Sequence, residues 1–247
     1  MRSVHGFAVT EFLRTEALTK RFRGLLANDK IDFSLAAGEI RCVIGPNGAG
    51  KTTFISMISG HLAPSDGRIW FKGKDITRLS LVLRARQGIA RKFQTPSVFD
   101  RLTVGDNLEL AALGKVGIPS ERAGRIKEIL ALTRLDDRLH VHASALSHGE
   151  RQWLEIAMLL ANRAELLLLD EPTAGMTAEE THATGELIRK LATTHGFSII
   201  IIEHDINFIR DLRAPVTVLH LGRILASGSF EEIAANATVR NVYLGQG

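Results

Sequence analysis

The 247-residue chain has little cysteine and no long apolar run, and each shortage excludes a class of protein. Its single cysteine, Cys42, lies in an apolar stretch, which excludes an internal disulfide framework and fits a small core residue in a reducing compartment. The longest aliphatic runs, 166–169 and 199–202, are far shorter than the roughly 20 residues of a spanning helix. The opening MRSVHGFAVTEFLRTE is not apolar enough for a signal peptide. We therefore expect neither a membrane span nor a secretion signal.

The composition is otherwise ordinary for a globular protein. Hydrophobic residues make up 45% and charged residues 23% of the chain, so disorder is not expected. The net charge of +4 permits an anionic ligand or a membrane-surface location. The basic residues are scattered rather than clustered with aromatic residues, and no nucleic-acid partner is expected.

Short aliphatic runs alternate with longer helical patterns. The runs 40–44, 166–169 and 198–202 are each followed by a loop and a helical pattern, which predicts an α/β fold with a mainly parallel sheet flanked by helices. The earlier segments LTKRF, IDFSLAAGEI and GRIWFKGKDI are short and separated by turns. They predict an N-terminal antiparallel β layer beside the main sheet.

The region 94–146 has a different pattern. LTVGDNLELAALG and SERAGRIKEILALTRLD are amphipathic with helical spacing, and no strand pattern accompanies them. We predict a single domain over 10–247, in which 10–93 and 147–247 form the core and 94–146 a helical subdomain. Residues 1–9 are expected to form a flexible N-terminus.

The stretch GPNGAGKTT, residues 45–53, lies between a strand pattern and a helical pattern and fits the phosphate-loop pattern G-x-x-x-x-G-K-[ST]. Glycines let backbone N–H groups approach a phosphate chain, and the following helix adds the positive end of its dipole. We expect Lys51 to pair with the β- and γ-phosphates, Thr52 to bind Mg²⁺ and Thr53 to reach the α-phosphate. The alternative is a glycine-rich turn that matches by chance. The predicted nucleotide-binding residues are Gly45, Asn47, Gly48, Ala49, Gly50, Lys51, Thr52 and Thr53.

The stretch LLLLDEP, residues 166–172, places two carboxylates at the C-terminal end of a buried strand, where doubly wound sheets bind ligands. Asp170 is expected to hold Mg²⁺. Glu171 is expected to polarise a water molecule for in-line attack on the γ-phosphate. The alternative is a solvated acidic turn.

Three further segments, LSHGERQWLEIAMLLA, RKFQTPSVF and IIIIEHD, complete a set of motifs. With the two motifs above, they make the whole chain resemble the ATP-binding subunit of ABC transporters, and the LS-x-G-[QE] signature before a helix is highly specific. The resemblance implies a P-loop NTPase core, ATP and Mg²⁺ as cofactors, and two subunits paired head to tail. Each ATP would lie between one subunit's phosphate loop and the other's Ser147, Gly149 and Glu150.

The resemblance also implies roles for single residues. His204 would contact the γ-phosphate and hold Glu171 and the attacking water in place. Gln94 would sense Mg²⁺ and that water, which makes Glu171, His204 and Gln94 the catalytic set and Thr52, Gln94 and Asp170 the metal set. Phe22 would stack on adenine; the alternative is a core phenylalanine.

Two positions depart from the family pattern. His148 replaces the usual second glycine of the signature, either as a tolerated variant or as a residue that tunes the site. Ala174, Gly175, Met176 and Thr177 match the loop that crosses between subunits, but Thr177 stands where an aspartate is common. The usual hydrogen-bond assignment is therefore not carried over to Thr177.

The segments RFRGLLAND, EPTAGM and VYLG resemble the branched-chain amino acid and amide uptake group. The segments that most resemble the ATP-binding subunit of urea importers are IRCVIGPNGAGKTT, GIARKFQTPSVFDRLTVGDNLELA, LSHGERQWLEIAMLL and AGMT. Urea is thus the expected solute, with branched-chain amino acids or short-chain amides as the alternative.

The resemblance implies several partners and a location. The partners are membrane permease subunits, a second ATP-binding subunit in a heterodimer or homodimer, and indirectly a periplasmic solute-binding protein. A helix of the permease would dock near 94–104, where Phe99 is either a contact or subdomain core. The location would be peripheral, on the cytoplasmic face of the inner (plasma) membrane.

Two other classes of protein share the phosphate loop. A soluble ABC-type ATPase of DNA repair or ribosomes would carry long coiled-coil insertions or two fused halves, and this chain has neither. A small-molecule phosphotransferase would leave the signature and His204 unexplained.

Overall fold

The computed structural model describes residues 11–92, 98–113 and 119–244. The expectations for residues 1–9 and for Gln94 fall outside these ranges. Within them, no helix has the length and apolar character needed to cross a bilayer.

The predicted antiparallel layer is confirmed as a four-stranded sheet with the order β2-β1-β4-β5. A tight turn at Arg23 and Gly24, both with positive φ, joins the two longest strands into a hairpin, as hairpin turns of this kind require. The strands are β1 (Glu11–Phe22), β2 (Leu25–Ala36), β4 (Asp66–Phe71) and β5 (Lys74–Asp75).

The predicted main sheet is a six-stranded one with the order β10-β9-β3-β8-β7-β6. Its strands are parallel except β10, which pairs antiparallel with β9. The strands are β3 (Ile40–Ile44), β6 (Ile89–Lys92), β7 (Leu166–Asp170), β8 (Ser198–Ile202), β9 (Val216–His220) and β10 (Arg223–Gly228). The sequence pattern identified β3, β7 and β8 but missed the other three.

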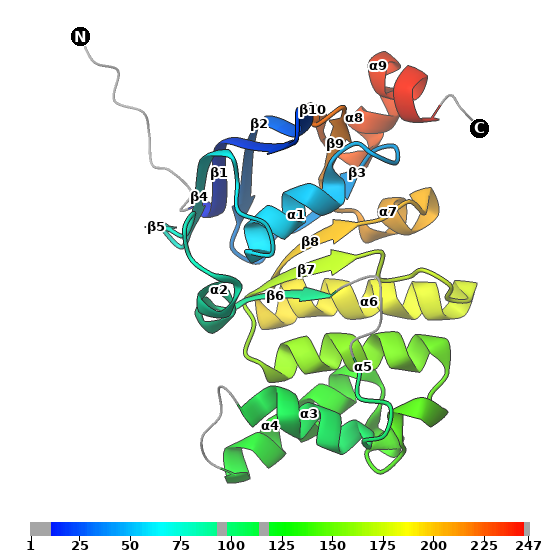
Figure 1. Cartoon of the computed structure of the whole chain (residues 1–247). Coiled ribbons are helices and arrows are strands. Elements are labelled where there is room, and N and C mark those ends of the chain that lie inside the picture. Colours follow the sequence, from blue (N-terminus) through cyan, green and yellow to red (C-terminus); the bar gives the residue numbers. More distant parts are fainter. Residues whose placement is uncertain (1–10, 93–97, 114–118, 245–247) are drawn as a thin grey trace.

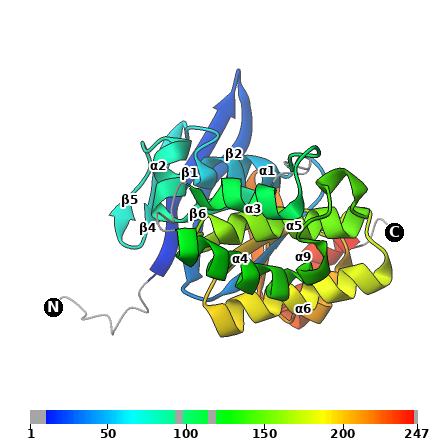
Figure 2. The same ribbon diagram turned by 90° about the horizontal axis from the view of Figure 1, so that it is seen from below.

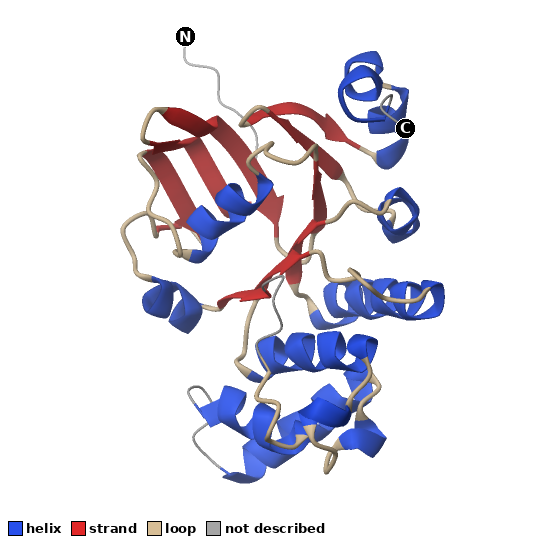
Figure 3. Ribbon diagram, turned by 45° about the vertical axis from the view of Figure 1, so that its right-hand side comes forward, coloured by secondary structure: helices blue, strands red, loops and turns tan. Residues whose placement is uncertain are grey.

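Alternating side chains of the main sheet enter two separate cores. Leu166 and Leu168 of β7 pack toward α1 and the antiparallel sheet, whereas Leu167 and Leu169 pack toward the helices on the opposite face. A strand buried on both faces needs the continuous aliphatic run that the sequence contains. Figure 1 shows the resulting layers, and Figure 3 shows the helices on both sides of the strands.

The predicted helices occur in the expected order, whereas α2 and the short helices near the C-terminus were not predicted. They are α1 (Lys51–Ser59), α2 (Leu81–Gln87), α3 (Val104–Leu113), α4 (Pro119–Thr133), α5 (His148–Ala161), α6 (Ala178–His195), α7 (Ile206–Leu212), α8 (Phe230–Ala235) and α9 (Ala237–Val239). Short 3₁₀ turns at Asp136–Arg138 and Ala143–Ala145 and a π-helical turn at Arg240–Leu244 complete the set.

The described part of the predicted helical subdomain contains α3, α4 and the two 3₁₀ turns, with no named strand. Both helices pack on α5, with Leu108 and Ile129 in the same core as Leu154. Figure 2 views this group from below. Because α5 begins at the signature, the signature is attached to the helical subdomain as well as to the core.

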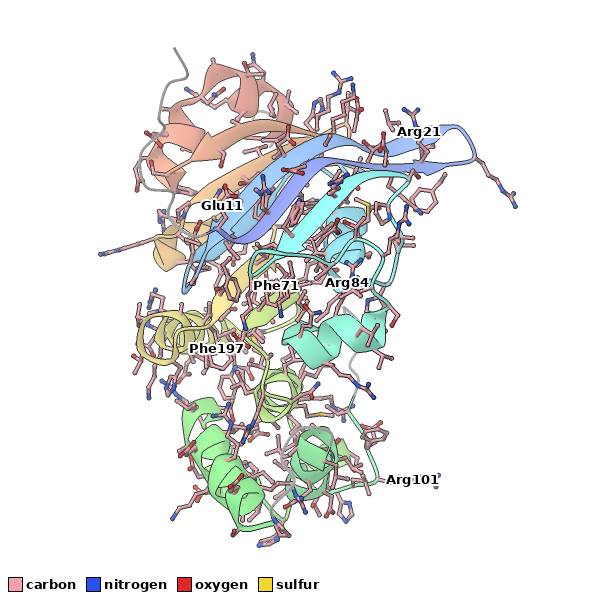
Figure 4. All side chains as sticks on the ribbon, turned by 90° about the vertical axis from the view of Figure 1, so that its left-hand side faces the viewer. Glu11, Arg21, Phe71, Arg84, Arg101 and Phe197 are labelled. Carbon is pink, nitrogen blue, oxygen red and sulfur yellow. The ribbon has the colours of Figure 1, made fainter. Side chains whose placement is uncertain are left out.

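A buried arginine anchors α1 from its far end. Arg84 of α2 is 1% exposed, and its guanidinium donates to the carbonyls of Met57, Ile58 and Thr77 (Arg84 is labelled in Figure 4). Burial lowers the pKa of Arg84 to about 10. The arginine satisfies carbonyl groups that the end of a helix leaves without partners and so fixes α1 behind the phosphate loop.

A buried ion pair joins the main sheet to α5. Nζ of Lys92, the last residue of β6, lies 3.2 Å from a carboxylate oxygen of Glu155, and the two side chains are 1% and 5% exposed. Removing one partner of such a pair leaves a desolvated charge uncompensated.

We expect Glu155→Ala to lower the free energy of unfolding by about 3–5 kcal/mol, because the Lys92 ammonium then stays buried without its carboxylate. Replacing both partners, as in Lys92→Met with Glu155→Leu, should recover most of the loss. Urea denaturation measures both effects. Glu186→Ala is the control, since its ion pair with Arg134 is exposed and should change stability by less than about 0.5 kcal/mol. Equal losses in Glu155→Ala and Glu186→Ala would contradict the argument.

Candidate functional site

One cleft of about 470 Å³ brings together most of the predicted nucleotide-binding residues. The loop between β3 and α1 forms its floor, the β1–β2 hairpin one wall, and the segments after β7 and β8 the other. A larger hollow of about 1060 Å³ lies between α6, α7 and the start of α8 and is lined by other residues. The cleft is lined by Phe22, Leu25, Leu26, Ala27, Asn47, Gly48, Ala49, Gly50, Lys51, Thr52, Thr53, Glu171, Ile202, His204 and Leu221.

The phosphate loop needs glycine for two different reasons. Gly48 has φ 78° with no atom within 4 Å of an added Cβ, so it leaves space open in the cleft. Gly50 has φ 100°, and an added Cβ would lie 2.4 Å from the carbonyl oxygen of Ala27. Gly50 also begins α1 without a side-chain cap, so the first N–H groups of that helix remain available for an anion.

Lys51 cross-links the phosphate loop through hydrogen bonds to its backbone. It is 6% exposed, and its Nζ donates to the carbonyl oxygens of Gly45 at 2.7 Å and Pro46 at 3.1 Å. Burial lowers the pKa of Lys51, and Glu171 and Asp170 offset part of that effect. Among the described residues, this buried ammonium donates to two neutral carbonyls, so it has capacity for an anionic partner.

Asp170, one of the predicted Mg²⁺ ligands, is buried beside an arginine. It is 1% exposed, its Oδ2 lies 3.1 Å from the Arg91 guanidinium, and its Oδ1 is buried with no hydrogen-bond partner among the described residues. Burial raises the pKa of Asp170, and Arg91 offsets part of the increase. Thr52 lines the cleft and is exposed, whereas Asp170 is not one of the lining residues. A hydroxyl and a carboxylate oxygen are ligands of the hard kind that Mg²⁺ prefers.

Glu171 and His204 lie next to each other on one wall of the cleft. His204 Nε2 lies 3.2 Å from Glu171 Oε1, and both side chains are partly exposed. Glu171 has φ 49°, a backbone region that non-glycine residues rarely occupy, and its N–H donates to the Ile202 carbonyl at 2.9 Å. The Glu171 carboxylate directly follows β7 and lines the cleft, and a water molecule beside it would face a general base.

The sequence analysis missed two residues, Glu203 and Arg91, that connect the segments around the cleft. Glu203 is buried, accepts from the N–H and hydroxyl of Thr173, and accepts from the N–H of His204 at 3.0 Å. It therefore ties the segment after β7 to the segment after β8. Arg91 donates to Ser56 Oγ at 2.7 Å as well as to Asp170, which connects β6 to α1. Glu203 could have been identified from the sequence, because it is a carboxylate directly after the apolar run of β8.

The far end of the cleft is apolar. Phe22 is 40% exposed, which excludes the alternative of a core phenylalanine, and Lys20 Nζ lies 5.1 Å from its ring centroid. Leu25 and Leu221 also line this end and are more exposed than Phe22. The flat ring of a nucleotide base could stack on this apolar surface.

The signature lies outside the cleft of its own chain. Ser147 caps α5, and its backbone N–H donates to the Glu150 carboxylate in a capping box. Glu150 also accepts from Arg138 at 2.7 Å. Burial works to raise the pKa of Glu150, but these hydrogen bonds outweigh it and the pKa lies below its ordinary value. Ser147, Gly149 and Glu150 are thus not brought together with the phosphate loop in one subunit.

The structure shows the environments of three residues whose roles the sequence left undecided. Phe99 is 53% exposed, so it is not subdomain core. Cys42 is fully buried, and burial raises its pKa to about 12, as expected for an inert core residue. Thr177 caps α6 and shares a capping box with Glu180.

Comparisons with known proteins agree with this geometry. A protein-family model described as ABC transporter matches residues 28–174. The probable branched-chain amino acid transport ATP-binding protein LivG of Archaeoglobus fulgidus is 35% identical over 250 residues, covering 95% of this chain and 96% of that protein. The lipopolysaccharide export system ATP-binding protein LptB of Acidithiobacillus ferridurans is 36% identical over 244 residues, covering 96% and 98%. A crystal structure of the ADP conformation of MJ1267, an ATP-binding cassette of an ABC transporter, has a TM-score of 0.86 at 28% identity, covering 96% and 99%.

Proposed function

Because the chain belongs to the ABC transporter family as an ATP-hydrolysing subunit, we propose that it powers import of branched-chain amino acids through separate membrane permease subunits. The single observation behind the ATPase chemistry is the cleft that joins the phosphate loop to Glu171 and His204. The LivG relatives favour branched-chain amino acids over the urea that the sequence segments first indicated. Urea and short-chain amides remain the second candidates, on the strength of those segments. LptB is equally similar, so identity alone does not choose the solute.

The proposed mechanism assigns a task to each of the main predicted site residues. Lys51 and the N–H groups of the loop bind the phosphates, Phe22 stacks on adenine, and Glu171 accepts a proton from the attacking water. His204 holds Glu171 through the 3.2 Å contact. Thr52, Asp170 and Gln94 would hold Mg²⁺, which neutralises charge on the transferred phosphate when it is bound.

The working unit is proposed to be a head-to-tail pair of ATP-binding subunits. Ser147, Gly149 and Glu150 lie outside the cleft of their own chain, and the exposed start of α5 carries N–H groups that favour an anion on a partner. A heterodimer with a related subunit is the preferred pair, on the inner face of the plasma membrane beside the permease. Phe99 is exposed and belongs to the segment 94–104, where the permease would dock.

Reconstitution with the permease and solute-binding protein encoded beside this chain tests the solute. ATP hydrolysis in liposomes should rise several-fold with leucine, isoleucine or valine and remain basal with urea or acetamide. Stimulation by urea alone would replace the amino acids with the second candidate. Failure to associate with any such permease would overturn the import role while leaving the ATPase chemistry intact.

A further inference from the structure

The start of α5 lies against the loop that follows β7. His148 Nε2 lies 2.8 Å from the carbonyl oxygen of Ala174. Gly175 makes this approach possible, because it has φ 75° and an added Cβ would lie 3.1 Å from the same nitrogen. The side chain that departs from the signature pattern therefore has a defined partner in the segment 174–177, which we call the crossing loop.

Neighbouring contacts hold the two segments together over two helical turns. An added Cβ at Gly149 would lie 2.2 Å from Glu180 Oε1, so the signature packs directly on the first turn of α6. Trp153 Nε1 donates to Thr184 Oγ1 at 2.9 Å, and that hydroxyl lies 3.3 Å from Met176 Sδ. Two side chains of this packed surface bond to the backbone of the crossing loop: Glu180 accepts from the N–H of Thr177 at 2.9 Å, and His148 reaches the carbonyl of Ala174 from the signature.

The carbonyl of Ala174 determines which ring nitrogen of His148 carries the hydrogen. An oxygen of this kind only accepts, so Nε2 of His148 carries the hydrogen and donates it to Ala174. The side-chain amide of Gln152 lies 3.3 Å from the same nitrogen, and its Oε1 is buried with no partner in the described part of the chain. As placed, the Gln152 amide nitrogen and the protonated Nε2 are two donors facing each other. Turning the amide so that Oε1 faces the ring removes this conflict, and the one hydrogen on Nε2 is then shared between Ala174 and Gln152.

The crossing loop leads directly to the proposed base. Ala174 N–H donates to the carbonyl of Glu171 at 3.3 Å, and Thr173 between them is held by Glu203. We propose that His148 is a positioning residue that ties the signature to the crossing loop, so that a nucleotide held by the signature in the partner's cleft sets the position of Glu171 in its own. This coupling rests on the proposed paired function, but the hydrogen bond itself does not.

Two variants of similar size separate the hydrogen bond from packing. His148→Leu removes the donor, whereas His148→Gln retains an N–H at nearly the reach of Nε2. In hydrogen–deuterium exchange of the full chain, His148→Leu should raise the exchange rate of peptides covering 171–177 by about threefold to tenfold, as expected for loss of one hydrogen bond. His148→Gln should stay within about twofold of the wild type. His140→Leu, at an exposed histidine of the helical subdomain, is the matched control and should change nothing there.

Steady-state ATP hydrolysis by the reconstituted transporter supplies the functional measurement. His148→Leu should lower kcat by about threefold to tenfold with KM for ATP unchanged, because the phosphate loop is untouched, and His148→Gln should restore most of the rate. Unchanged exchange in His148→Leu would overturn the proposal, and so would raised exchange with unchanged kcat. If the wild type hydrolysed no ATP, the proposed function would fail, whereas the exchange experiment would still test the hydrogen bond.

Discussion

Glu171→Gln is expected to lower kcat for ATP hydrolysis by on the order of 100-fold or more while ATP still binds. The amide keeps the size of the side chain and can still reach His204, but it cannot accept a proton from the attacking water. The phosphate contacts come from the loop between β3 and α1 and do not depend on Glu171. The variant should therefore accumulate an ATP-bound pair of subunits, which size-exclusion chromatography with and without ATP detects.

Glu128→Gln is the matched control for this prediction. Glu128 is a highly exposed carboxylate on α4, far along the chain from the cleft motifs, and its variant should hydrolyse ATP at the wild-type rate. Near wild-type turnover in Glu171→Gln would remove Glu171 as the proton acceptor. The 3.2 Å contact with His204 would then serve only to stabilise the loop.

The parts of the fold that the sequence predicts are those whose signal is local. β7 and β8 are runs of aliphatic residues because both of their faces are buried, and Gly50 is required by a backbone angle and a close approach that any phosphate loop of this shape shares. β6 escapes prediction because it is short and ends in Arg91 and Lys92. Their charges are compensated only in three dimensions, by Asp170 and Glu155.

In the candidate site, too, the residues with a local sequence signal were predicted, and those that depend on tertiary contacts were not. Lys51, Asp170 and Glu171 follow from patterns that place a side chain at a strand end or helix start. The partner of His148 is 26 residues away in the sequence, and that of Glu203 is 30 residues away. No spacing rule connects such pairs, because their proximity depends on how α5 and β8 pack beside the segment after β7. The sequence therefore identifies the residues of the chemistry before those that position them.

Lys51→Ala is expected to weaken ATP binding by about 10- to 100-fold, which corresponds to the loss of about 1.5–3 kcal/mol from a charge-assisted contact. Burial already lowers the pKa of Lys51 in the protein alone, so the ammonium gains more from a triphosphate than from the carbonyls of Gly45 and Pro46. Its removal should therefore change the stability of the free chain little, by less than about 1 kcal/mol, since the desolvation cost is lost together with two hydrogen bonds.

Isothermal titration calorimetry with ATP and thermal unfolding with and without ATP measure the two effects separately. Saturating ATP should stabilise the wild type by about 2.7 kcal/mol at 100 times its Kd and the variant by much less at the same concentration. Lys74→Ala, at an exposed lysine of β5, is the control and should bind ATP like the wild type. Equal ATP affinity in Lys51→Ala and the wild type would mean that backbone N–H groups alone hold the phosphates and that the buried ammonium serves to fix the loop.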